Sequence, residues 1–95
     1  MLSGKQKRYL RSLGNNLKAI VIIGKDNLTY NIFNSLEGAL KAHELVKVSL
    51  LKTCDLDVRE VAIELAANTS SEVVQIIGRT IILYKQSKDR KITLP

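Results

Sequence analysis

The chain has 95 residues and a net charge of +6, with 45% apolar and 25% charged residues, which predicts one folded domain spanning residues 1–95. Its single cysteine, Cys54, excludes an internal disulfide, and with only one histidine it cannot form a Cys/His zinc site. No apolar run approaches the roughly 18 residues of a membrane span and no signal-peptide core follows the basic N-terminal residues, so we expect a cytoplasmic protein without metal or cofactor.

The N-terminal residues predict a helix followed by a strand. Ser3 and Gln6 form a Ser-x-x-Gln capping box that begins the helix, and Gly14 followed by two asparagines ends it. The wholly apolar run 19–23 predicts a strand that is buried on both faces. Leucines at helical spacing predict the buried stripe of the helix: Leu10, Leu13 and Leu17.

The middle of the chain predicts two more helices around a second strand. The second helix follows Leu28 and Thr29, and alternating apolar residues predict a strand over residues 45–52. Asp55 and Asp57 suit the positive N-terminal end of a third helix. The core face of the second helix is predicted to contain Ile32, Phe33, Leu36, Leu40 and His43, and that of the third Val58, Val61, Ala62, Leu65 and Ala66.

The last two β-rich runs, 73–77 and 80–84, are separated only by Gly78 and Arg79, which predicts a hairpin with a type II′ turn. The element order is therefore α-β-α-β-α-β-β, with crossovers between the first strands. We predict a mixed α/β (α+β) fold in which helices pack on a four-stranded mixed sheet. One core is expected to contain Ile20, Ile22, Phe33, Leu36, Leu40, Val48, Val61, Leu65, Ile76 and Ile82.

The positive charge is concentrated at the two ends of the chain. Residues 1–25 carry six bases and no acid, residues 26–75 eight acids and four bases, and residues 76–95 five bases and one acid. If the fold brings the two ends together, they form one cationic surface that attracts polyanions such as nucleic acids. The alternative is a solvated surface that only keeps the protein soluble.

The turn Gly24-Lys25-Asp26-Asn27 is the strongest local candidate for a binding site. Gly24 permits a tight turn and a close approach by a ligand, and Asn27 tolerates a left-handed conformation. The helix that follows directs amide donors and partial positive charge outward, which predicts a small phosphate-binding loop with Lys25 as its cation. The turn is neither a Walker loop nor a dinucleotide fingerprint, and an ordinary strand–helix turn is the alternative.

No set of residues predicts catalysis. His43 lies at a helix end, and the charges of Asp55 and Asp57 oppose formation of a Cys54 thiolate. The two aspartates could ligate a cation, but helix capping explains them more simply. The four aromatic residues do not alternate with basic residues as in an RRM domain, so a base-stacking sheet face is not predicted.

Motifs spread along essentially all 95 residues resemble a known family. In chain order they are Leu2-Ser3-Gly4-Lys5-Gln6-Lys7-Arg8, Gly24-Lys25-Asp26-Asn27-Leu28-Thr29, Ala42-His43-Glu44-Leu45-Val46-Lys47-Val48, Val74-Gln75-Ile76-Ile77-Gly78-Arg79-Thr80 and Leu83-Tyr84-Lys85. Together they are similar to the bacterial YhbY-like proteins, which are stand-alone versions of the chloroplast RNA splicing and ribosome maturation (CRM) domain.

The resemblance implies an α-β-α-β-α-β-β fold similar to the C-terminal domain of translation initiation factor three. It also implies RNA binding, association with precursors of the large ribosomal subunit, and no catalysis. In the family the loop after the first strand is usually GxxG, similar to the backbone-clamping loop of KH domains. Here Asn27 replaces the last glycine and Asp26 adds an anion beside Lys25, so we expect a weaker clamp and more reliance on the flanking basic segments.

The leading hypothesis is a monomeric RNA-binding module that acts on ribosomal RNA during ribosome assembly. Two alternatives stay open, a small basic DNA-binding protein of the Alba kind and a protein–protein adaptor whose charge only aids solubility. The expected RNA contacts are Lys5, Lys7, Arg8 and Arg11 in the first helix, Gly24, Lys25, Asp26 and Asn27 in the loop, and Arg79, Lys85, Lys88, Arg90 and Lys91 toward the C-terminus.

Overall fold

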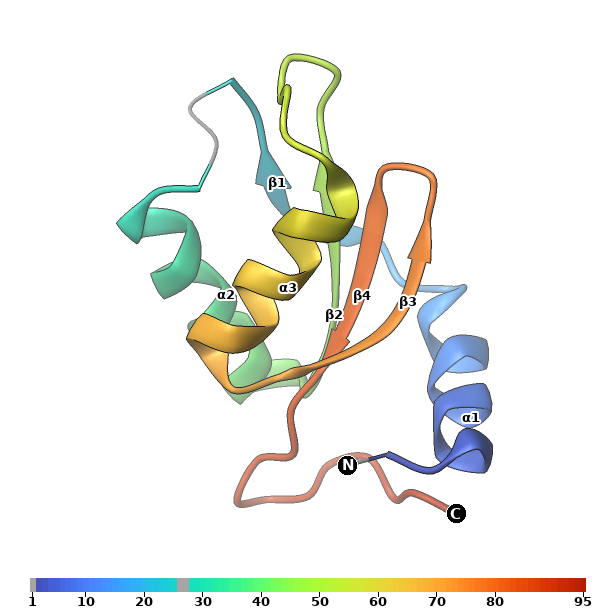
Figure 1. The fold of residues 1–95 in the computed structure, drawn as a ribbon. Coiled ribbons are helices and arrows are strands. Elements are labelled where there is room, and N and C mark those ends of the chain that lie inside the picture. The colour runs from blue at the N-terminus through green and yellow to red at the C-terminus, as the bar shows by residue number, and fades with distance from the viewer. Residues whose placement is uncertain (1, 26–27) are drawn as a thin grey trace.

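The computed structural model describes residues 2–25 and 28–95. Its elements confirm the predicted order (Figure 1): α1 (Gly4–Gly14), β1 (Ala19–Ile23), α2 (Tyr30–His43), β2 (Leu45–Leu50), α3 (Val58–Thr69), β3 (Glu72–Ile77) and β4 (Thr80–Tyr84). The strands form a four-stranded mixed sheet in the order β1-β2-β4-β3. β1 pairs parallel to β2, whereas β4 pairs antiparallel to both β2 and β3.

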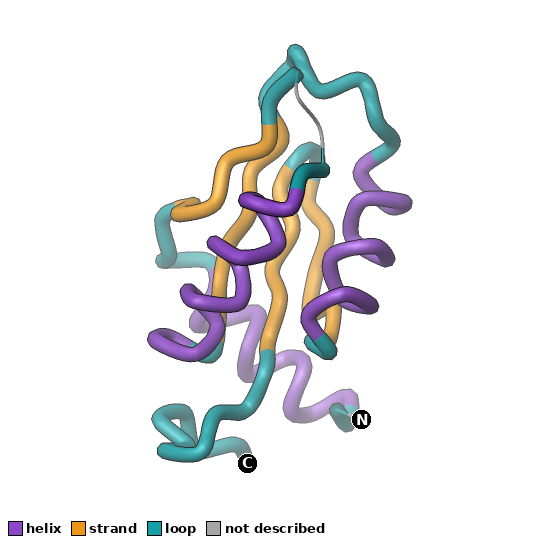
Figure 2. Tube along the Cα trace, turned by 90° about the vertical axis from the view of Figure 1, so that its left-hand side faces the viewer, coloured by secondary structure: helices purple, strands orange, loops and turns teal. Residues whose placement is uncertain are grey.

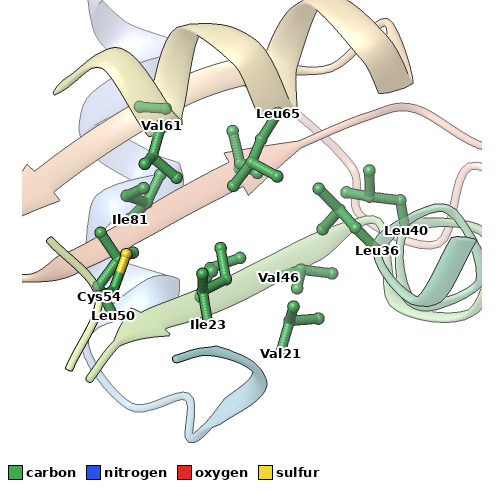
Figure 3. Close-up of a cluster of buried hydrophobic side chains, with 13 residues drawn as sticks. Val21, Ile23, Leu36, Leu40, Val46, Leu50, Cys54, Val61, Leu65 and Ile81 are labelled. Atoms are coloured by element: carbon green, nitrogen blue, oxygen red, sulfur yellow. The ribbon is translucent and has the colours of Figure 1, made fainter. Parts of the chain in front are cut away.

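Helices cover both faces of this sheet, as Figures 1 and 2 show. α2 and α3 lie on one face, and α1 packs against β2 and β3 on the other. The larger core, between the sheet and α2 and α3, contains thirteen buried residues that include Leu36, Val61 and Ile81 (Figure 3). A smaller core beneath α1 contains Leu10, Leu45, Val74, Ile82 and Tyr84. The prediction of one shared core is therefore wrong for Ile82, which lies on the α1 side.

β1 is buried on one face only, which corrects the prediction for residues 19–23. Val21 and Ile23 are buried in the larger core, but Ile20 is 53% exposed and Ile22 is 46% exposed. β1 is an edge strand, and α1 packs on β2 and β3 rather than over it. Leu17 is also exposed, because α1 ends at Gly14 and the predicted stripe does not continue beyond it.

The C-terminal end of α2 also differs from its prediction. His43 is exposed and does not belong to the core face. The helix ends at this residue, and the chain turns inward at Glu44, which has φ +64° and is fully buried. The buried face of α2 therefore ends at Leu40, and the next buried residue of the chain is Glu44, directly after the helix.

Other turns follow the sequence signals closely. The capping box of α1 is confirmed: Ser3 Oγ accepts from the Gln6 amide at 3.1 Å, and Gln6 Oε1 accepts from the Ser3 amide at 3.0 Å. Gly14 ends α1 where the helix meets the sheet, since a Cβ there would lie 2.7 Å from Ile82 Cδ1. In the β3–β4 hairpin, Gly78 has φ +57°, as the first central residue of a type II′ turn requires.

Candidate nucleic-acid interface

The candidate residues lie in two regions at opposite ends of a molecule that measures 37 × 24 × 22 Å (Figure 1). We call the first the loop end; it contains Gly24, Lys25, the start of α2 and the hairpin residue Arg79. We call the second the basic end; it contains α1 and the C-terminal segment, residues 85–95. Asp26 and Asn27, which the sequence also places in the binding loop, lie outside the described residues.

The fold brings the two basic ends of the chain together, and both termini lie at the same end of the molecule in Figures 1 and 2. Gln6 Nε2 at the start of α1 donates to the carbonyl of Pro95 at 3.3 Å. The partly buried side chains that pack on the α1 core come from both ends of the chain, namely Leu2, Leu13, Ile92 and Leu94. The two basic ends of the chain therefore lie together, as one shared cationic surface requires.

α1 presents the free cations of the basic end. Lys5 and Arg8 are exposed and Lys7 is half buried, and none of their three side chains bonds to another residue in the described part of the chain. Arg11 is partly engaged, because its Nε donates to the carbonyl of Val74 at 3.4 Å. Lys5 and Arg8 are three residues apart and Lys7 and Arg11 four apart, so each pair lies side by side on the helix surface.

In the C-terminal segment the fold itself uses two of the four predicted cations. Lys85 Nζ donates to the carbonyl of Thr69 at 2.8 Å, and Lys91 Nζ donates to the carbonyl of Ala42 at 2.5 Å. These carbonyls lie in the last turns of α3 and α2, where no helical partner is available and the helix dipole is negative. Lys88 and Arg90 are exposed, and their side chains donate a hydrogen bond to no other described residue.

At the loop end, Lys25 is exposed and precedes α2 in the chain. Thr29 Oγ1 accepts from the Ile32 amide at 3.3 Å, while the amides of Tyr30 and Asn31 have no acceptor among the described residues. The first turn of α2 carries no acid. The free amides and the dipole of α2, together with a lysine, can bind a phosphate.

The local contacts of Gly24 and Arg79 show what each residue does within the fold. A Cβ at Gly24 would make ordinary contacts, 3.4 Å from Leu51 Cδ1 and 3.6 Å from Thr53 Oγ1, so packing alone does not require glycine there. Arg79 donates to three backbone carbonyls at the end of β2 and in the β2–α3 loop: Leu50 at 3.2 Å, Leu51 at 2.7 Å and Cys54 at 2.7 Å. Arg79 thus joins the hairpin to this loop, and its RNA contact stays a prediction.

The residues considered for catalysis or metal binding do not gather into a site. Among the described residues no group of three His, Cys, Asp or Glu side chains could hold a metal ion. Cys54 is buried in the larger core, whereas His43 is exposed at the end of α2. Within residues 2–25 and 28–95, no helix has the length and apolar character needed to cross a membrane.

The model of the CRS1/YhbY (CRM) domain family matches residues 2–85. The chain belongs to this family. It is 47% identical to the Bacillus subtilis protein named "Probable RNA-binding protein YqeI", over the full length of both chains. It is 36% identical to a Haemophilus influenzae protein named "RNA-binding protein", over 99% of this chain and 95% of the other. The solution structure of the Staphylococcus aureus protein SAV1595 matches all of both chains with a TM-score of 0.84 and 44% identity.

In this CRM domain, Glu44 anchors the C-terminal segment, a role that sequence reasoning missed. Its carboxylate accepts from the Ser87 amide at 2.7 Å, from Ser87 Oγ at 2.5 Å and from the Ile92 amide at 2.7 Å. Burial by itself raises the pKa of Glu44, but the hydrogen bonds from Ser87, Ile92 and the Lys91 backbone outweigh it and hold the pKa below its ordinary value. The sequence signal for this role is an acidic residue that lies directly between the end of a helix and an apolar strand.

Tyr30 is a second residue of this CRM domain that the sequence did not single out. It is the first residue of α2, and 77% of its side chain is exposed at the loop end. An exposed aromatic ring beside a candidate phosphate-binding loop can stack on an unpaired base. The signal was an aromatic residue directly after the N-cap Thr29.

Proposed function

We propose that the chain is a non-catalytic RNA-binding protein that binds ribosomal RNA in precursors of the large ribosomal subunit, as a monomer in the cytoplasm. Membership of the CRM family and the names of the relatives support RNA as the ligand. The observation that carries the proposal is the set of free cations on α1, Lys5, Lys7 and Arg8. No acid lies on this helix to compete with a phosphate for them.

The basic end would hold the RNA through its backbone. Neighbouring cations on a helix surface are about 5–6 Å apart at their Cβ atoms, so the two α1 pairs offer adjacent positions for phosphates. Such contacts fix the position of the RNA without selecting its sequence. Lys88 and Arg90 extend the same surface from the C-terminal segment.

The loop end would hold a second part of the RNA. Lys25 and the free amides of Tyr30 and Asn31 supply donors for one phosphate, and the Tyr30 ring is exposed beside them. Because the two regions lie at opposite ends of the molecule, they would contact different segments of one RNA, or two strands of a folded RNA. This arrangement suits a structured ligand such as ribosomal RNA.

The proposal is tested in cells by sequencing the RNA that crosslinks to the protein, together with its sedimentation on gradients. We expect crosslinks in large-subunit ribosomal RNA and sedimentation with large-subunit precursors. Replacing Lys5, Lys7 and Arg8 together by Gln should remove both signals, whereas the matched triple replacement of Lys41, Lys52 and Arg59, which are also exposed, should retain them. Crosslinks spread over messenger RNAs would contradict the ribosomal part of the proposal.

A further inference from the structure

A pocket of about 400 Å³ opens between α1, β1 and β2, on the sheet face away from α2 and α3. Leucine and isoleucine side chains, among them Leu13, Leu17 and Ile20, form most of its wall. Its polar groups are Lys18, His43 and Lys47, and none of the described residues that line it is acidic. We call it the β1 pocket.

The β1 pocket lies where the sheet lacks a covering helix. Ile20 and Ile22 are about half exposed on the edge strand, and Leu17 precedes them in the chain. Pairing of Ala19 with Lys47 places the lysine of β2 beside this apolar strand. Single exposed apolar residues are ordinary on a protein surface. Here Leu17 and Ile20 both line one pocket, and Ile22 lies on the same face of β1 as Ile20, which indicates a binding surface.

We infer that the β1 pocket takes one unpaired nucleotide of the bound RNA, with its base against the apolar wall and its phosphates near Lys18 and Lys47. This inference rests on the proposed RNA binding. The chemistry of the pocket lining indicates which ligand it binds. Its apolar wall suits a base, and its lysines, with no acidic residue among the described lining, suit the phosphates on either side. His43 adds a ring of the kind on which unpaired bases stack.

The size and position of the β1 pocket agree with this occupant. Pockets for small ligands range from about 300 to 1,000 Å³, and they combine apolar walls with a few polar groups. Leu13 lies in α1 and Leu17 shortly after it, so an RNA strand held by the cations of α1 passes close to the pocket. Bases in a regular duplex are stacked and paired, so only an unpaired segment could place a base there.

The test compares single-stranded and paired RNA. The probes are hexauridylate, hexaadenylate and a short blunt RNA duplex, titrated against the full chain at fixed salt. Ile20→Thr and Lys47→Gln should each weaken binding of at least one hexanucleotide roughly five-fold, the low end of a base-stacking contribution, and leave duplex affinity unchanged. Thr is β-branched and suits an exposed strand position, so the fold should be retained.

Two matched variants control for loss of exposed apolar surface and of charge. Ile77 is 52% exposed on the other edge strand, β3, compared with 53% for Ile20, and it does not line the pocket. Ile77→Thr and Lys52→Gln should leave all affinities unchanged. In NMR spectra of the wild-type complex, nuclear Overhauser effects should join base protons to the Ile20 methyl groups.

Three results would overturn the inference. Equal effects of Ile20→Thr and Ile77→Thr, with RNA binding intact, would show that the β1 pocket is not used and would leave the proposed function standing. If the NMR signals of the pocket residues shift with protein concentration in the absence of RNA, the surface binds a second copy of the chain instead. A wild-type protein that binds none of the three RNAs would overturn the proposed function and this inference together.

Discussion

Helix α1 and the C-terminal segment are both strongly basic, but the fold uses their cations in different ways. The side chains of Lys5, Lys7 and Arg8 on α1 donate to no other described residue. In the C-terminal segment, Lys85 and Lys91 donate to carbonyls that end α3 and α2. A lysine that neutralises a helix end contributes to stability and is less available to a phosphate. Positive charge in a sequence therefore indicates a polyanion ligand only where the fold leaves that charge free.

The largest expected effect is on the anchor of the C-terminal segment. Glu44→Gln removes the charge that three hydrogen bonds stabilise and places an amide group against their donors. We expect the free energy of unfolding to fall by about 2–3 kcal/mol, the range for buried hydrogen bonds to a charged group. Urea denaturation measures it, with Glu37→Gln on α2 as the control. Equal stability of the two variants would contradict the role of Glu44.

The same anchor should depend on pH. The pKa of Glu44 is lower in the folded chain than its ordinary value of 4.5, so its ionisation stabilises the fold above that value. This stabilisation is lost as the pH falls through the lowered pKa of the folded state. The difference in unfolding free energy between wild type and Glu44→Gln should therefore shrink when denaturation is repeated from neutral pH down to about pH 3. A constant difference would show that Glu44 acts without its charge.

A smaller loss is expected for the lysines that neutralise helix ends. Replacing Lys85 and Lys91 together by Gln should lower the free energy of unfolding by about 1 kcal/mol, because two helix C-termini lose a cation. The matched replacement of Lys7 and Arg8 by Gln should leave it unchanged, since neither side chain bonds to another described residue. Thermal melts of both variants provide the comparison. A larger loss for the α1 pair would reverse the assignment of the two regions.

The smallest expected effect concerns the loop end. Lys25→Glu should weaken RNA binding a few-fold, because one phosphate contact is replaced by a repulsion. Lys52→Glu is the control, since Lys52 is also exposed and also follows a strand, β2. Affinity is measured by titration, with thermal melts to verify the fold. If both variants bind like wild type, the segment from Gly24 to Lys25 is an ordinary strand–helix turn.

Features that depend on neighbouring residues could be predicted from the sequence. The capping box of Ser3 and Gln6 joins residues three apart, and the turn at Gly78 needs only a positive φ. The exposure of Ile20 could not be predicted in this way. An apolar run shows that a strand can be buried on both faces, but whether a helix covers its outer face depends on where α1 packs.

The sequence also could not predict which cations are free to bind RNA. Lys91 bonds to a carbonyl 49 residues away in the chain, and Lys85 to one 16 residues away. Arg79 reaches three carbonyls between Leu50 and Cys54. Composition placed these residues in basic segments together with Lys5 and Arg8, but only the tertiary structure shows which of them the fold already uses.

The most direct test of the difference between the two regions is the salt dependence of RNA affinity for two double variants. Lys7→Gln/Arg8→Gln and Lys85→Gln/Lys91→Gln each remove two positive charges from a chain of net charge +6, so they are matched in overall charge. We predict that the α1 pair flattens the slope of log affinity against log salt by about 1–2 units, while the C-terminal pair leaves it unchanged. Equal flattening by both pairs would contradict the account, because total charge rather than free cations would then determine binding.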